Sequence, residues 1–281
     1  MNIHEALKQF KFEMEHAITS GAFNGKKKKN GLEAKRALIC SERLIHLIHD
    51  AVKHDFMRQG IPSSYITPGY KETKREITLT GEFKQKRQDV VIIPPLKPCP
   101  EKITWGPMAH LDKTDVFGKV LSEKMLSINI RSQMSSLSKN MDTLLERTVA
   151  ESLNLHRRLE SLVMGEVYLI PTHEYDPEAM KQFQVSFHHK RTPLERYISF
   201  FNSINHRKKK NEPHHYYERC CLMIVDFNRS VPKLYQSTDE LKRDGLIDPH
   251  FSVDMKDLDY NHFTYDLLNT YHDRHHLSHL S

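Results

Sequence analysis

An acid beside an apolar run and a row of polar residues mark where this 281-residue chain could act on a phosphate ester. Asp89 stands directly before the apolar run 90–93, where a charge is costly unless it lies at a sheet edge or in a site. Farther along, alternation with apolar or small residues places three polar side chains on one face of a strand, namely Asn129, Arg131 and Gln133. That face would present a cation between two amides.

Two carboxylates on the helix predicted next could join these residues. Asp142 and Glu146 are one turn apart and lie along one margin of its apolar stripe. Hydrolysis of a phosphodiester needs a nucleophilic water and neutralisation of the phosphate charge, and a divalent metal ion supplies both. Because Mg²⁺ is held by few carboxylates together with water and phosphate, two or three such acids would suffice.

Hydrophobic periodicity predicts the elements that must position these side chains. Helical spacing predicts helices over residues 31–59 and 136–159. Alternating or wholly apolar runs predict strands over residues 76–88, 90–93, 124–133 and 166–171. Because strands alternate with helices, we expect an α/β fold with a mixed central sheet flanked by helices.

The rest of the chain adds a long loop and a C-terminal extension. Residues 94–122 are rich in proline and contain the only tryptophan, and loops of this length are usually functional or disordered. In the segment 183–281, a helix over 193–204, a strand over 220–227 and a helix beginning near Ser237 are predicted. We expect residues 1–281 to form a single domain.

The predicted order of elements carries a family resemblance. A helix, three strands, a helix and a strand, with an acid at the start of the second strand, resemble the αβββαβ core of the PD-(D/E)XK nucleases. The stretches 128–136, 139–147 and 165–171 look like a type II restriction endonuclease. The resemblance covers residues 31–172 and implies a catalytic core there, followed by the helix–strand–helix extension, which would complete the sheet and contribute to DNA binding.

The resemblance also implies roles for the polar residues. Asp89 matches the first acid of the family, but the family's acid-x-lysine triplet is replaced by Asn129-Ile130-Arg131. In some members the second acid lies on the following helix, where this chain has Glu146. Asp89 and Glu146 would then bind Mg²⁺ with help from Asp142, while Arg131 stabilises the phosphate charge and Gln133 orients water or phosphate. Glu33 or Glu42, on the first long helix, could add a further ligand.

Charge favours a polyanionic partner. The net charge is +6 and the isoelectric point is near 9.0. Arginine, lysine and amide side chains contact phosphates and base edges in DNA complexes. The candidates for such contacts here are Lys84, Lys86, Arg87, Lys139, Asn140, Arg207, Lys208 and Lys209. A homodimer is expected as well, because a two-fold protein matches a palindromic site on double-stranded DNA.

Other classes of protein lack support in the sequence. The four cysteines form no CxxC pair, and no GxxxxGKS or GxGxxG sequence is present. The His49-Asp50 pair has the pattern of the HD phosphohydrolases, but those enzymes are all helical, whereas strands are predicted here. No apolar stretch approaches the length of a membrane span and the N-terminus has no signal-peptide apolar region, so we expect a cytoplasmic protein with no membrane partner.

The sequence thus predicts a type II restriction endonuclease that hydrolyses double-stranded DNA with Mg²⁺. A repair or recombination nuclease of the same fold is one alternative. A catalytically inert DNA-binding module is another, because the acid-x-lysine triplet is missing from the third strand.

Overall fold

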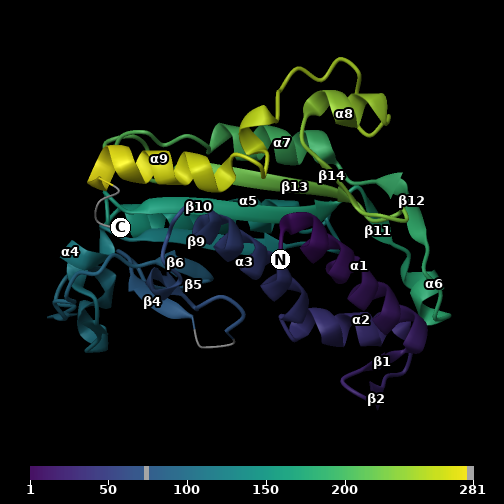
Figure 1. The fold of residues 1–281 in the computed structure, drawn as a ribbon, viewed down its shortest axis with the longest axis horizontal. Helices are drawn as coiled ribbons and strands as arrows, with labels where there is room; N and C mark the ends of the chain where they lie inside the picture. The colour runs from purple at the N-terminus through teal and green to yellow at the C-terminus, as the bar shows by residue number, and fades with distance from the viewer. Residues whose placement is uncertain (73–75, 277–281) are drawn as a thin grey trace.

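A mixed six-stranded sheet forms the centre of the molecule (Figure 1). The computed structural model describes residues 1–72 and 76–276. In spatial order the strands are β14 (Lys233–Tyr235), β13 (Arg219–Asp226), β10 (Val163–Pro171), β9 (Leu126–Ser132), β6 (Val90–Ile92) and β3 (Ile66–Thr67). The three central strands β13, β10 and β9 are parallel, and the other neighbouring pairs are antiparallel. The predicted α/β fold with a mixed central sheet flanked by helices is confirmed.

Two separate apolar cores cover the two faces of this sheet. One face packs against α1 (Ile3–Ser20), α2 (Gly31–Cys40), α3 (Arg43–Arg58) and α9 (Phe263–His275). The other face packs against α5 (Met141–His156), α7 (Leu194–Ser203) and α8 (Thr238–Arg243). Strand β9 contributes Leu126, Ile128 and Ile130 to the first core, so its alternate residues point toward α5.

Short ribbons and helices surround the sheet. The ribbons pair β1 (Ala22–Phe23) with β2 (Lys26–Lys27), β4 (Ile77–Thr80) with β5 (Gln85–Gln88), β7 (Glu101–Lys102) with β8 (Thr114–Asp115), and β11 (His173–Tyr175) with β12 (Phe187–Arg191). Two short helices are α4 (Gly118–Ser122) and α6 (Pro177–Lys181), and 3₁₀ turns lie at Ser63–Tyr65, Gly106–Leu111 and Lys256–Leu258. No helix in the described ranges is both long and apolar enough to cross a membrane.

The strand predicted over residues 76–88 is a hairpin that stands outside the central sheet, which corrects the predicted first strand. Gly81 begins the turn between β4 and β5 and packs against α5, where an added Cβ would lie 2.3 Å from Nδ2 of Asn154. Asn154 Oδ1 accepts hydrogen bonds from the backbone N–H groups of Phe83 and Lys84, at 2.8 and 3.0 Å. The buried Asn154 thus holds the hairpin turn against α5.

Two other predicted segments are also divided. The helix expected over 31–59 breaks into α2 and α3, because Glu42 adopts the left-handed conformation with φ of 62°. The loop over 94–122 contains β7, a 3₁₀ turn, β8 and α4, so it is an ordered insertion. It is held to the end of α5 by Arg158, which pairs with Glu101 and Asp115 and lies 4.8 Å from the ring centroid of Trp105.

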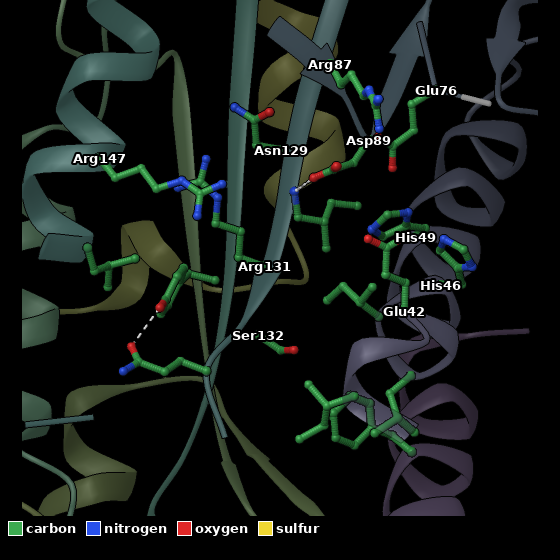
Figure 2. A pocket seen from close by; sticks show the side chains of 18 of the residues that line it. Glu42, His46, His49, Glu76, Arg87, Asp89, Asn129, Arg131, Ser132 and Arg147 are labelled. Carbon is green, nitrogen blue, oxygen red and sulfur yellow. Dashed lines mark hydrogen bonds between the residues drawn. The ribbon is translucent and has the colours of Figure 1, made fainter. Parts of the chain in front are cut away.

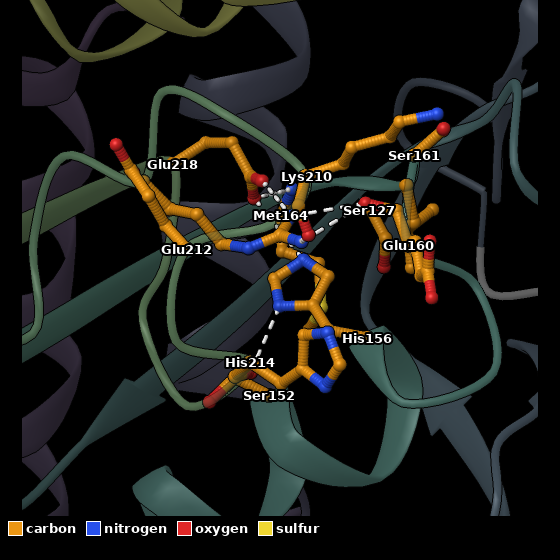
Figure 3. A network of polar contacts seen from close by, with 12 residues as sticks. Ser127, Ser152, His156, Glu160, Ser161, Met164, Lys210, Glu212, His214 and Glu218 are labelled. Atoms are coloured by element: carbon orange, nitrogen blue, oxygen red, sulfur yellow. Dashed lines mark hydrogen bonds and ion pairs between the residues drawn. The ribbon is translucent and has the colours of Figure 1, made fainter.

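A wholly buried carboxylate holds one end of the α5 layer together (Figure 3). Glu218 Oε1 pairs with Nη1 of Arg207 at 2.8 Å and with Nη1 of Arg274 at 2.7 Å. Its Oε2 accepts the backbone N–H of Met164 at 2.7 Å and lies 3.3 Å from Nε2 of the buried His156. Burial alone would raise the pKa of Glu218, but the surrounding cations lower it to about 2.

This network corrects one predicted DNA contact. The Arg207 side chain is 0% exposed and donates to the backbone carbonyls of Glu160 and Lys210 as well as to Glu218. A guanidinium in that position cannot reach DNA, so the assignment of Arg207 to a DNA surface is wrong. Its neighbours Lys208 and Lys209 are exposed.

Replacing Glu218 should strongly destabilise the fold. We expect Glu218→Gln to lower the free energy of unfolding at pH 7 by about 3–5 kcal/mol, since it leaves buried cations without their carboxylate. A depressed pKa stabilises the protein above the ordinary value of 4.5, so the difference from wild type should shrink as the pH falls through 4.5 toward 2. Urea denaturation checks this. Glu160→Gln, at an exposed neighbouring acid, serves as the control and should change stability little.

Candidate functional site

A cleft of about 440 Å³ opens beside β9, beyond Ile128, where its pairing with the first residue of β6 ends. Strand β6 pairs with β9 only through Val90–Ile92, opposite residues 126–128, so the later residues of β9 have no sheet partner on that side within the described chain. Helix α3 and the hairpin β4–β5 border the cleft on one side of β9, and α5 borders it on the other (Figure 2). The cleft therefore exposes a strand edge at the centre of the molecule.

Asp89 extends the pairing of β6 by means of its side chain. Its Oδ2 accepts a hydrogen bond from the backbone N–H of Ile130 at 2.5 Å. The Asp89 side chain thus takes the place that a backbone carbonyl of a longer β6 would have in the sheet. Burial raises the pKa of Asp89, the Ile130 N–H group lowers it, and the charge of Glu76 raises it again, so that it reaches about 6. The position expected for Asp89, at the start of a buried strand and beside a site, agrees with this geometry.

Acids and histidines gather beside Asp89 on the α3 side of the cleft. Glu42, His46, His49 and Glu76 line this wall. Burial, and then the charge of Glu42, raises the pKa of Glu76. Burial and the neighbouring His46 lower the pKa of His49 to about 3, so its ring is neutral at pH 7. Glu42 thus lines the cleft, and its role as a further metal ligand stays a prediction.

Cations line both the hairpin and the α5 side of the cleft. Lys86 and Arg87 come from β5, Arg131 from β9 and Arg147 from α5. Arg131 is 15% exposed and pairs with Glu151, and its Nη1 lies 3.4 Å from both Thr148 Oγ1 and Glu166 Oε1. The guanidinium predicted to neutralise phosphate therefore lies in the cleft, where it is already paired with two buried acids.

Glu166 is a buried acid that the sequence argument did not single out. It is 0% exposed in the middle of β10 and lies opposite Asn129 in the strand register. Within the described chain, both of its carboxylate oxygens and Nδ2 of Asn129 lack hydrogen bonds. Burial raises the pKa of Glu166 to about 7, against the opposing effect of Arg131. The sequence feature that could have identified Glu166 is its position as a single acid inside the apolar run of β10, because an unpaired charge there is costly.

Glu151 is a second buried acid that the sequence did not single out. It lies on α5, is 1% exposed and faces the cations. Two of the three cations that it contacts come from other segments of chain, β5 and β9, so periodicity on α5 alone could not reveal why an acid faces inward.

Gln133 holds the loop that precedes α5. Its Oε1 accepts hydrogen bonds from the hydroxyls of Tyr168 and Tyr197, at 2.8 and 3.1 Å, and its Nε2 donates to the carbonyl of Ser136 at 3.2 Å. Both ends of the amide are thus engaged within the protein. Although Gln133 lines the cleft, this geometry favours a positioning role over direct contact with water or phosphate.

The two acids predicted on α5 are not brought together with Asp89. Asp142 is exposed and pairs with Arg196 on α7, and Glu146 is exposed. Neither side chain lines the cleft, whereas Leu144 and Arg147 of the same helix do. Their metal-binding role remains a prediction from the sequence.

The predicted DNA contacts fall into separate surfaces. Lys86 and Arg87 line the cleft, and Lys84 is exposed near the turn of the same hairpin. Lys139 and Asn140 are exposed at the start of α5. In contrast, Lys208 and Lys209 line a different cavity, together with residues of α9.

The acids present suit a magnesium site better than a metal cage built by protein alone. In the described ranges, no three acidic, histidine or cysteine side chains form a metal-binding group. Mg²⁺ needs only one or two carboxylates when water and substrate phosphate provide the remaining ligands. Asp89 and Glu76 both line the cleft, and the charge of Glu76 raises the pKa of Asp89, so these two carboxylates are the candidates to hold such an ion.

Comparisons with family models, with curated proteins and with solved structures find no match to this chain. No relative therefore indicates a substrate or a partner. The chemistry of the cleft is the basis on which a function can be inferred.

Neutralising Glu166 should stabilise the protein at high pH. Because its pKa is raised from 4.5 to about 7, the ionised side chain destabilises the folded state increasingly between those pH values. We expect Glu166→Gln to be more stable than wild type at pH 8, by up to about 3 kcal/mol, and the difference to be smaller at pH 5. Urea midpoints at the two pH values measure it.

The exposed acid Glu146 supplies a matched control, since Glu146→Gln should leave stability nearly unchanged at both pH values. A Glu166→Gln variant less stable than wild type at pH 8 would show that the ion pair with Arg131 outweighs the cost of burial.

Proposed function

We propose that this protein is a Mg²⁺-dependent endonuclease that cleaves double-stranded DNA, of the type II restriction class. The observation that carries the proposal is that an acid and several cations line the same cleft. Asp89 lies at the start of β6 on the α3 side of the cleft, with Arg87 beside it, while Lys86, Arg131 and Arg147 gather around Glu151 on the α5 side. A cleft with a metal-binding acid facing several cations is suited to hold a phosphodiester between the two.

The order of elements supports the same proposal. Along the chain, α3, β3, β6, β9, α5 and β10 follow the αβββαβ order of the PD-(D/E)XK core. In that comparison β6 is the second strand, and Asp89 stands at its start. Because β9 and β10 are parallel, the α5 crossover between them covers the face on which Arg131 lies.

The residues of the cleft have distinct proposed roles. Asp89 and Glu76 would hold Mg²⁺, which when bound activates a water molecule and neutralises phosphate charge. Arg131 would stabilise the negative charge on the phosphate. Gln133 would keep the loop before α5 in place through its hydrogen bonds to Tyr168 and Tyr197.

The proposed partners follow from the reaction. A homodimer would bring two such clefts to the two strands of a palindromic site. Lys84 and Lys139 are exposed and available for further DNA contacts. We place this activity in the cytoplasm, as the sequence predicts.

Removing the Asp89 carboxylate should abolish cleavage. We expect Asp89→Asn to cut plasmid DNA with Mg²⁺ at least about a hundredfold more slowly than wild type, because even outer-shell partners of a metal are worth 10–100-fold. Asp239→Asn, at an exposed acid of α8, should cut normally. Gel analysis of the products measures the rate and also shows whether discrete fragments form.

The same assay separates the competing assignments. Discrete fragments support restriction, whereas structure-specific nicking or smearing supports a repair nuclease. If Glu146→Gln and Asp142→Asn lose activity while Glu76→Gln keeps it, the acids of α5 are the ligands. Normal cutting by Asp89→Asn would refute the role of Asp89.

An inert DNA-binding module is the second candidate function. The observation that favours it is the engagement of Arg131 by Glu151 and Glu166, together with the lack of an acid at Asn129 on β9. Intact DNA that is shifted on a gel, under every metal condition tested, would support this candidate.

A further inference from the structure

We propose that Lys86, Arg131 and Arg147 form a binding site for a single phosphate group, and that the buried Glu151 is the residue that positions them. The inference rests on the proposed function only in naming a DNA phosphate as the natural ligand. The site itself would bind phosphate whether or not the protein cuts DNA.

One carboxylate gathers these three cations. Glu151 is 1% exposed, its Oε1 lies 3.3 Å from Nε of Arg147, and it pairs directly with Nζ of Lys86 and with Nη2 of Arg131. The three cations come from β5, β9 and α5, so only the tertiary fold brings them together. All three line the same cleft, next to Asp89.

The cations outnumber the acids that they contact. Three positive charges share Glu151, and Glu166 is the other acid paired with one of them in the described chain. Burial, and then the charges of Arg131 and Arg147, lowers the pKa of Lys86, which shows that these cations repel one another. A bound anion would relieve that repulsion.

The donors suit phosphate in particular. Arg147 remains 62% exposed at its side chain and contacts Glu151 through Nε, which leaves its terminal nitrogens available in the cleft. Guanidinium groups bind phosphate through two parallel hydrogen bonds, and Lys86 adds a point charge. Three donor groups from three directions match the several oxygens of a phosphate better than the two of a carboxylate.

The role of Glu151 can be tested by whether Glu151→Gln raises or lowers the affinity for phosphate. If the cations acted through charge alone, Glu151→Gln would strengthen phosphate binding, because it removes a negative charge from the cluster. If Glu151 positions the cations, the same change weakens binding. Glu151→Asp should then recover part of the affinity, because it restores the carboxylate. Circular dichroism establishes that each variant is folded.

Isothermal titration calorimetry of the full chain with inorganic phosphate, at low ionic strength, tests the site. We expect Arg147→Gln to weaken phosphate binding about tenfold or more, as loss of one charge-assisted bidentate contact would. Arg147→Lys should show an intermediate loss. Arg157→Gln, at an exposed arginine that ends the same helix outside the cleft, should bind as wild type does. Because Arg147 is exposed, its variants test the site even if Glu151→Gln does not fold.

DNA binding provides an independent measurement. The affinity for a short DNA duplex is measured without Mg²⁺ at several salt concentrations. The slope of log affinity against log salt concentration should be smaller in magnitude by about one in Arg147→Gln than in wild type. Wild-type phosphate affinity and salt dependence in Arg147→Gln would overturn the inference, as would tighter phosphate binding by folded Glu151→Gln. If the wild-type protein binds phosphate as expected but never cuts DNA, the proposed nuclease fails and the phosphate site stands.

Discussion

The need to pair a buried guanidinium shapes the middle of this structure. Arg131 lies beneath α5, where an isolated charge would be strongly unfavourable, and it is held by Glu151 on the helix and Glu166 on the neighbouring strand. Those pairs connect β9, β10 and α5 at one point, and Lys86 joins the hairpin β4–β5 to the same carboxylate of Glu151. Four segments of chain therefore depend on one small group of charges.

A second buried network lies at the C-terminal end of the same helix. There Glu218 draws together His156 of α5, Arg274 of α9 and Arg207 in the loop after α7. Leu155, Tyr168 and Phe201 belong to one continuous apolar core on this face of the sheet. The two networks differ in character. The one around Glu218 is closed to solvent and suits a structural role, whereas the one around Glu151 opens into the cleft, where its cations can meet a ligand.

The cleft lies beside β9 because β6 is short and pairs with only part of that strand. Had β6 begun before Val90, the backbone of those earlier residues would have paired with the edge of β9 near Ile130. The Asp89 side chain makes that hydrogen bond instead, and the space beside it is left to α3 and the hairpin. An acid is thus fixed at the start of β6, close to Arg131 of β9.

Local features of the sequence determined the elements and the positions of several site residues. Apolar runs identified β6, β10 and β13, alternation put Arg131 and Gln133 on one face of β9, and the charge beside an apolar run singled out Asp89. The tertiary structure alone decided which charges meet. Glu151 and Glu166 are far apart in the sequence and become partners of Arg131 only when α5 packs on β9 and β10, while Arg207 is removed from the surface by its pairing with Glu218. Periodicity reports which way a side chain points, but Coulomb interactions act across space between segments that are distant in the chain.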